Sequence, residues 1–165
     1  MKKFLMIVIL LLLICTATSM AMDAQNTIYV DFPRFIKGIY PFSYETIISD
    51  QQTISLGYTY YSTNVLYDGN ASVSGYSVQL GTAHYFKEAL DGPYWAVDAG
   101  YNQLETNGDT DFINGSSYEL QARFGIKRIF DNGFTLDLSG GYNVFFPRDK
   151  VKDGTVAGFT IGYSW

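Results

Sequence analysis

The chain has 165 residues, a formal net charge of −5, aromatic side chains at 17% of positions, and a mean hydropathy near zero. The acidic balance excludes a nucleic-acid-binding protein, which would carry basic patches. No apolar run after residue 21 is long enough for a transmembrane helix, which excludes a helical membrane protein and leaves one domain of ordinary size.

The first 21 residues have the form of a secretory signal peptide. Lys2 and Lys3 precede an apolar run from Phe4 to Cys15, and small residues then lead to Ala21, after which we expect cleavage. The run has twelve residues, whereas a helix needs about 20 to cross a bilayer. Residues 22–165 are therefore predicted to be a cysteine-free exported domain with a formal charge of −7.

The stretch Asn26–Ile48 contains one segment with clear alternation and one without. In Tyr40–Ile48 apolar and polar side chains alternate, which predicts a strand. Thr27–Phe35 alternates less well, and Pro33 is tolerated in a strand only near an edge or a bulge. The stretch therefore forms either two strands joined near Ile36–Ile39 or one bent strand.

Six later segments alternate apolar with polar side chains, as strands with one apolar face do. Each has a glycine at its centre, on the polar side: Gly57, Gly81, Gly100, Gly125, Gly141 and Gly162. Longer and shorter steps alternate between these glycines. That pattern predicts tight turns at Lys87–Pro93 and Asp131–Gly133, and long loops at Asn64–Gly75, Glu105–Ser117 and Pro147–Gly154.

The central glycines indicate which face of each strand is enclosed. A narrow barrel of eight strands leaves an interior just wide enough for side chains, so small residues are needed there. We therefore expect the polar faces to line a lumen and the apolar faces to meet lipid. Because bacterial single-chain barrels have even strand numbers, eight strands are preferred to seven.

The last strand ends on an outward aromatic set that resembles the C-terminal insertion signal of outer-membrane barrels: Phe159, Ile161, Tyr163 and Trp165. With the signal peptide and the loop pattern, residues 22–165 resemble the small outer-membrane barrels of the OmpA and OmpX type. The resemblance implies an all-β, eight-stranded antiparallel up-and-down transmembrane barrel in a Gram-negative-type outer membrane, with a periplasmic C-terminus. It also implies contact with lipid and lipopolysaccharide, and with the barrel-assembly machinery during insertion.

The predicted lumen holds six charged side chains: Glu45, Asp98, Glu119, Arg123, Lys127 and Asp137. A three-residue hairpin at Asp131–Gly133, with Gly133 left-handed, places Lys127 opposite Asp137. Such a set is expected to fill and rigidify the barrel without forming a wide pore. A proton or ion path is the alternative interpretation.

Catalysis and cofactors find little support in the sequence, and the predicted role is structural or surface contact. His84 is the only histidine, and it points outward among the rim aromatics Tyr85, Phe86 and Tyr94. Outer-membrane lipid A deacylases pair an outward histidine with a serine two positions on, where this chain has Phe86. No zinc set exists, and Asn107–Asn114 lacks the full ligand spacing of a calcium loop. A lipid-modifying enzyme and a soluble lipocalin-like carrier remain as alternatives.

Overall fold

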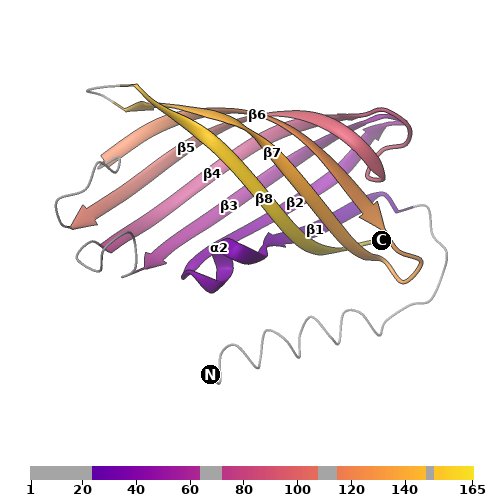
Figure 1. Ribbon diagram of the computed structural model, residues 1–165, viewed down its shortest axis with the longest axis horizontal. Coiled ribbons are helices and arrows are strands. Elements are labelled where there is room, and N and C mark those ends of the chain that lie inside the picture. Colours follow the sequence, from indigo (N-terminus) through magenta and orange to yellow (C-terminus); the bar gives the residue numbers. More distant parts are fainter. Residues whose placement is uncertain (1–23, 64–71, 108–114, 148–150) are drawn as a thin grey trace, which may run out of the picture.

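The computed structural model describes residues 24–63, 72–107, 115–147 and 151–165. They form a closed antiparallel barrel in which each strand pairs with the next along the chain and the last pairs with the first (Figure 1). The strands are β1 (Asn26–Asp31), β2 (Ile39–Ser49), β3 (Gln52–Thr63), β4 (Ser72–Tyr85), β5 (Gly92–Asn107), β6 (Gly115–Ile129), β7 (Phe134–Pro147) and β8 (Lys152–Ser164). The all-β, eight-stranded up-and-down fold predicted from the sequence is confirmed. The predicted signal peptide lies outside the described residues.

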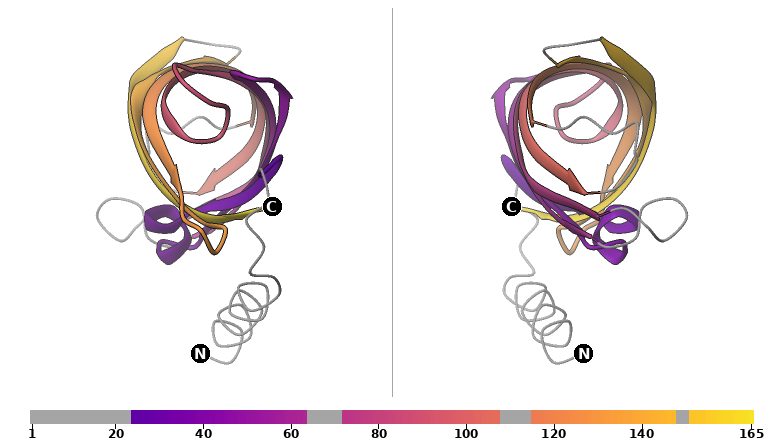
Figure 2. Two further views of the ribbon diagram at one scale, coloured as in Figure 1. Left: turned by 90° about the vertical axis from the view of Figure 1, so that its right-hand side faces the viewer. Right: turned by 90° about the vertical axis from the view of Figure 1, so that its left-hand side faces the viewer.

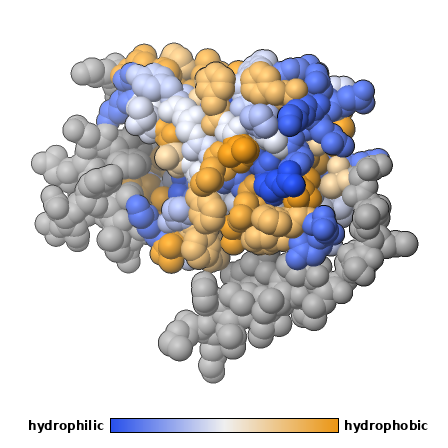
Figure 3. All heavy atoms as spheres, turned by 45° about the vertical axis from the view of Figure 1, so that its right-hand side comes forward, coloured by the Kyte–Doolittle hydropathy of each residue, from blue (hydrophilic) through white to orange (hydrophobic). Residues whose placement is uncertain are grey.

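Apolar side chains cover the outer wall of the barrel. Leu56, Leu120 and Leu138 are each half exposed or more, whereas their polar sequence neighbours are buried or half-buried inside. Figure 3 shows hydrophobic residues over much of the wall, with hydrophilic ones gathered toward the end that carries the turns. A protein in water would expose few such side chains together, so this surface suits an apolar solvent.

The two ends of the chain close the barrel. The backbone amides of Gln25 and Asn26 both donate to the carbonyl oxygen of Trp165, at 2.9 and 3.0 Å, and the Trp165 amide donates back to Asn26 at 3.0 Å. β1 and β8 then pair from Thr27 and Ser164 onward. No backbone edge is left open at this end of the β1–β8 junction.

The first predicted strand, Thr27–Phe35, is wrong in its second half. β1 stops at Asp31, and a short helix, α2 (Phe32–Ile36), follows. The Asp31 carboxylate accepts a hydrogen bond from the Arg34 amide at 3.1 Å and caps the helix, and Pro33 lies in the first turn, where a missing N–H costs nothing. The prediction of two strands rather than one bent strand is confirmed.

The early end of β1 leaves a notch in the barrel wall. Its last pair with β8 is Asp31 with Thr160, although β8 continues for eight residues toward Lys152. Over this length β8 pairs with β7 only, and Ile39–Pro41 of β2 pair with β3 only. α2 lies outside the ring of strands beside this notch (Figure 2).

The described turns that join one strand directly to the next lie at one end of the barrel. The start of β1 and the end of β8 share one end of the barrel with the turns at 50–51, 86–91 and 130–133. The strand ends at Thr63, Ser72, Asn107, Gly115, Pro147 and Lys152 lie at the other end. Strand pairing extends beyond the predicted bounds, so Gly75 belongs to β4 and Glu105 to β5. Alternation of side chains continues past these residues, and the predicted loops were too long. In the described chain, no helix has the length and apolar character needed to cross a bilayer.

Candidate functional site

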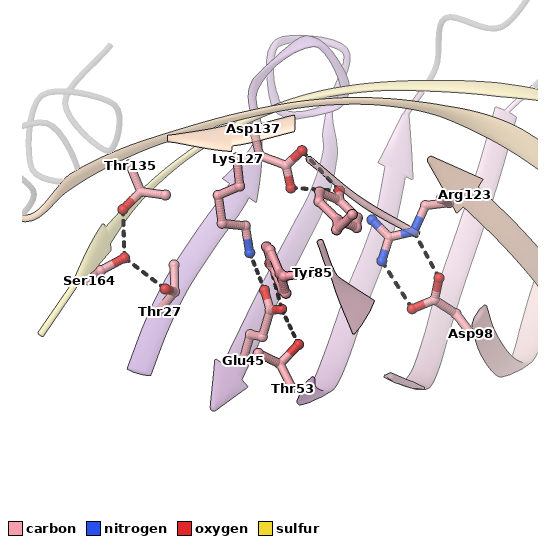
Figure 4. A network of polar contacts seen from close by, with 11 residues as sticks. Thr27, Glu45, Thr53, Tyr85, Asp98, Arg123, Lys127, Thr135, Asp137 and Ser164 are labelled. Carbon is pink, nitrogen blue, oxygen red and sulfur yellow. Dashed lines mark hydrogen bonds and ion pairs between the residues drawn. The ribbon is translucent and has the colours of Figure 1, made fainter. Parts of the chain in front are cut away.

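An ion pair between Lys127 on β6 and Glu45 on β2 crosses the lumen toward the end that carries the turns (Figure 4). Lys127 is 1% exposed and Glu45 3%. The Lys127 ammonium also lies over three tyrosine rings, at 4.9, 5.8 and 6.0 Å from the centroids of Tyr29, Tyr85 and Tyr94. Aromatic faces attract a desolvated cation, so the charge is held from several sides of the barrel.

Hydrogen bonds extend this pair to neighbouring strands. The hydroxyl groups of Thr53 and Tyr85 donate to the Glu45 carboxylate, and the Tyr94 hydroxyl donates to both carboxylate oxygens of Asp137 at 2.9 and 3.0 Å. A buried carboxylate that accepts several such bonds loses less of its solvation. The network therefore links strands β2 to β7 across the lumen.

Lys127 and Asp137 lie opposite each other, as the predicted hairpin requires, but they are not the ion pair. Gly133 has a φ of +79°, the Phe130 amide donates to the Phe134 carbonyl, and the backbone register places Lys127 beside Asp137. The Lys127 ammonium nevertheless contacts Glu45. A lysine side chain is long enough to cross a narrow lumen, and backbone register does not fix where its end lies.

A second ion pair lies further along the lumen. Arg123 binds the Asp98 carboxylate through two nitrogens, at 2.8 and 3.1 Å. Gly81 lies directly beneath it: a Cβ at this position would lie 2.0 Å from the Asp98 Oδ1 atom. Gly125 has the same relation to the Tyr94 ring, at 2.6 Å. These two glycines leave the space that the charged and aromatic side chains occupy.

Three hydroxyl groups bridge the junction where the barrel closes. The Ser164 hydroxyl lies 2.7 Å from that of Thr27 and 2.6 Å from that of Thr135, and Thr135 donates to the Gly133 carbonyl at 3.1 Å (Figure 4). The chain of hydroxyls connects β1, β8 and β7. It fills the lumen next to the terminal end.

The connection between β4 and β5 folds inward and covers one opening. Leu90 is fully buried and Ala89 is 5% exposed, and the Ala89 amide donates to the Asp50 carbonyl at 2.9 Å. Figure 2 shows this segment lying across the mouth of the barrel. Leu90 has a φ of +70°, a strained value for a residue with a side chain. The sequence predicted only a tight turn here, because nothing in its composition separates an inward turn from an outward one.

Tyr85 and Tyr94 lie inside the barrel next to the inward turn, and not on the outer rim that was predicted from the sequence. They are 0% and 3% exposed, and their ring centroids are 5.1 Å apart. Strand periodicity already assigns both to the polar face, since each is an odd number of residues from outward Leu80 or Trp95. His84 does lie on the outer wall, with ring contacts to Phe86 and Trp95.

The opposite end of the lumen contains Glu119, which is 6% exposed. Its carboxylate accepts hydrogen bonds from the side-chain amides of Gln79, Asn102 and Asn143 and faces a cavity of about 490 Å³. In the described ranges, no three histidine or acidic side chains come together as a metal-binding set. Most of the weak calcium candidate, Asn107–Asn114, lies outside those ranges.

Comparison with known proteins supports this architecture. No family model and no curated protein sequence matches the chain. Among solved structures, the chain is similar to the N-terminal β-barrel domain of OprF from Pseudomonas aeruginosa, with a TM-score of 0.55 and 19% sequence identity. The match covers 86% of this chain and 96% of that one.

The chain therefore has the fold of that β-barrel domain. At this identity the likeness concerns the fold alone. Two ion pairs, the contacting rings of Tyr85 and Tyr94, and an inward turn occupy the interior of the barrel in this chain.

Proposed function

We propose that the chain is a structural and surface-contact protein of a Gram-negative-type outer membrane, with a filled lumen and no wide pore. The turns and both termini face the periplasm in this proposal. α2 and the connections at 64–71, 108–114 and 148–150 face outward and provide the contact surface. The apolar outer wall contacts lipid and lipopolysaccharide, and the outward aromatics of β8 serve as the insertion signal for the assembly machinery.

The observation that supports a closed lumen best is the buried ion pair of Lys127 and Glu45. It spans the interior from β6 to β2, and tyrosine rings surround it. Water or ions passing along the axis would have to displace a desolvated charge pair, which costs several kcal/mol. The inward turn with buried Leu90 adds a second barrier at one mouth.

Planar-bilayer recordings with the purified mature barrel test this proposal. We expect no large, steady conductance steps from the wild-type protein. The double variant E45Q/K127M removes both charges together and leaves the tyrosines in place, so it is a matched control for passage through the axis. Large steps from the wild type would overturn the closed-lumen proposal. Membrane fractionation decides the location, since a soluble carrier would appear in the periplasmic extract.

The enzymatic alternative, a lipid-modifying enzyme that uses His84, can be tested directly. A lipid-modifying enzyme would change the mass of lipopolysaccharide incubated with the barrel, and the change would disappear in His84→Ala. We expect no mass change with either protein. His84 contacts two aromatic rings on the outer wall and has Phe86 at the position where a serine partner is needed.

A further inference from the structure

Glu119 differs from the other carboxylates of the lumen in its partners. Glu45 and Asp98 each bind a cationic side chain, and Asp137 lies opposite Lys127 in the strand register. Glu119 accepts hydrogen bonds from three neutral amides. Among the residues that the structure describes, no cationic group lies within ion-pair distance of it.

The three amides surround the carboxylate from three strands. Gln79 of β4 and Asn102 of β5 donate to one oxygen at 3.2 and 3.4 Å, and Asn143 of β7 donates to the other at 3.2 Å. Gly100 leaves the space for this arrangement, because a Cβ there would lie 3.0 Å from the Gln79 Cγ atom. The three amides thus hold the carboxylate in position, and none of them carries a positive charge.

The cavity above Glu119 has the size and lining of a small-molecule site. Its volume of about 490 Å³ falls in the range of roughly 300–1,000 Å³ typical of ligand pockets. Glu119 and the amides of Asn102 and Asn143 supply polar groups. Its apolar wall consists of Ile39, Tyr61, Leu104 and Phe145.

Two cationic side chains, Arg34 and Lys152, line the cavity, and each has an acidic residue close to it in the chain. Arg34 pairs with Asp31 at 3.4 Å. Lys152 and Asp153 are adjacent on β8 and contribute opposite charges to the lining. Asp31 and Asp153 offset the charges of Arg34 and Lys152. The negative charge of the Glu119 carboxylate then favours a positively charged ligand in the cavity.

We propose that this cavity binds a small organic cation with a primary ammonium group on a short apolar body. An ammonium group can donate three hydrogen bonds, which match the Glu119 carboxylate and the carbonyl oxygens of the neighbouring amides. Tyr61 and Phe145 offer aromatic surface to the charge and the body. One carboxylate is a poor match for calcium, which takes six to eight oxygen ligands. The site is independent of the structural role proposed above.

The test is titration of the folded mature barrel in lipid nanodiscs with n-butylammonium chloride, followed by calorimetry at constant ionic strength. We expect saturable binding to the wild type, and for E119Q an affinity about tenfold or more weaker, because the buried charge partner is lost. Glutamine keeps the shape, and its one oxygen can still accept the hydrogen bonds of Gln79 and Asn102, whereas its NH2 group cannot accept the one from Asn143. E105Q is the matched control, since it removes an exposed acidic group near the same end of the barrel that does not line the cavity; its affinity should stay close to wild type.

A second measurement needs no variant. Side-chain amide resonances of Asn102 and Asn143 should shift on addition of n-butylammonium and stay in place on addition of butan-1-ol, which has the same apolar body without the charge. Equal binding of the alcohol, equal affinity of wild type and E119Q, or unmoved amide resonances at saturating cation would each overturn the proposal. A gel shift on boiling verifies that every variant is folded before titration.

Discussion

At the scale of single residues, the identity of the buried charges was predictable and their pairing was not. Period-two alternation assigns Glu45, Lys127 and Asp137 to the polar face of their strands. Lys127 and Glu45 are 82 positions apart in the chain, and the stagger of strands around the barrel brings them together. This stagger is the shift in register that accumulates around the closed sheet, so it cannot be predicted from a local pattern in the sequence.

The ion pair of Lys127 and Glu45 leads to a prediction about stability. Lys127→Met leaves Glu45 buried without its cation, and we expect it to lower the free energy of unfolding by about 3–5 kcal/mol. The double variant E45Q/K127M should recover much of this loss, because both charges are gone. Urea unfolding followed by tryptophan fluorescence measures both.

Arg128→Ala is the control for that measurement. Arg128 is next in sequence and binds Asp91 at 3.1 Å, but its side chain is 69% exposed, so its pair contributes about 0–1 kcal/mol. A loss in Arg128→Ala equal to that in Lys127→Met would show that any removed cation has the same effect.

Gly81 gives a second prediction at this scale. In Gly81→Ala the new methyl group would collide with Asp98 and with the Ser55 hydroxyl, at 2.0 and 2.8 Å. We expect a loss of about 1–3 kcal/mol from overpacking, measured by the same unfolding assay. Gly140→Ala is matched, because its nearest neighbour would be a carbonyl oxygen at 3.9 Å, and it should be tolerated. Equal losses would show that strand glycines act through flexibility and not through space.

At the scale of elements, the short β1 and α2 are the main departure from a regular barrel. Sequence signals for the helix were present, because Asp31 followed by Phe32 and Pro33 is a helix start with an N-cap. The prediction of a strand over Thr27–Phe35 gave more weight to the even number of strands expected of a bacterial barrel. The inward turn at 86–91 had no comparable signal, because it depends on contacts with the β2–β3 turn.

The notch beside α2 predicts an uneven pattern of hydrogen exchange along β8. Residues of an antiparallel strand direct their amides to alternate sides. Between Lys152 and Phe159 every second amide therefore faces the notch, and we expect it to exchange quickly. Amides from Thr160 to Ser164, which have partners on both sides, should exchange slowly. Nuclear magnetic resonance in micelles resolves single residues, and uniform protection along β8 would contradict the notch.

At the scale of the whole molecule, the fold followed from the sequence because three patterns agreed. Alternation gave the strands, central glycines gave the enclosed face, and alternating spacings gave the order of turns and loops. The hairpin at Asp131–Gly133 was predicted with its register, since its turn residues are local to it. Cavities, by contrast, depend on which side chains meet across the lumen, and Glu119 was recognised only as a lumen charge.

The proposed orientation can be measured with single cysteines. Asn132→Cys lies in the exposed β6–β7 turn, and Glu105→Cys lies exposed near the far end of β5. We expect a membrane-impermeant maleimide to label Glu105→Cys on intact cells, and Asn132→Cys only after the outer membrane is permeabilised. The opposite pattern would place the termini outside.

The hydrogen bonds between Trp165 and Asn26 have a consequence for how the protein is made. Because β8 is the neighbour of β1, β1 has no second partner until the chain as far as Trp165 is present. A chain shortened by a single strand would carry two unprotected edges, at β1 and β7, and such edges invite pairing between molecules. Truncated products should accordingly be lost to aggregation and degradation, with no smaller working form.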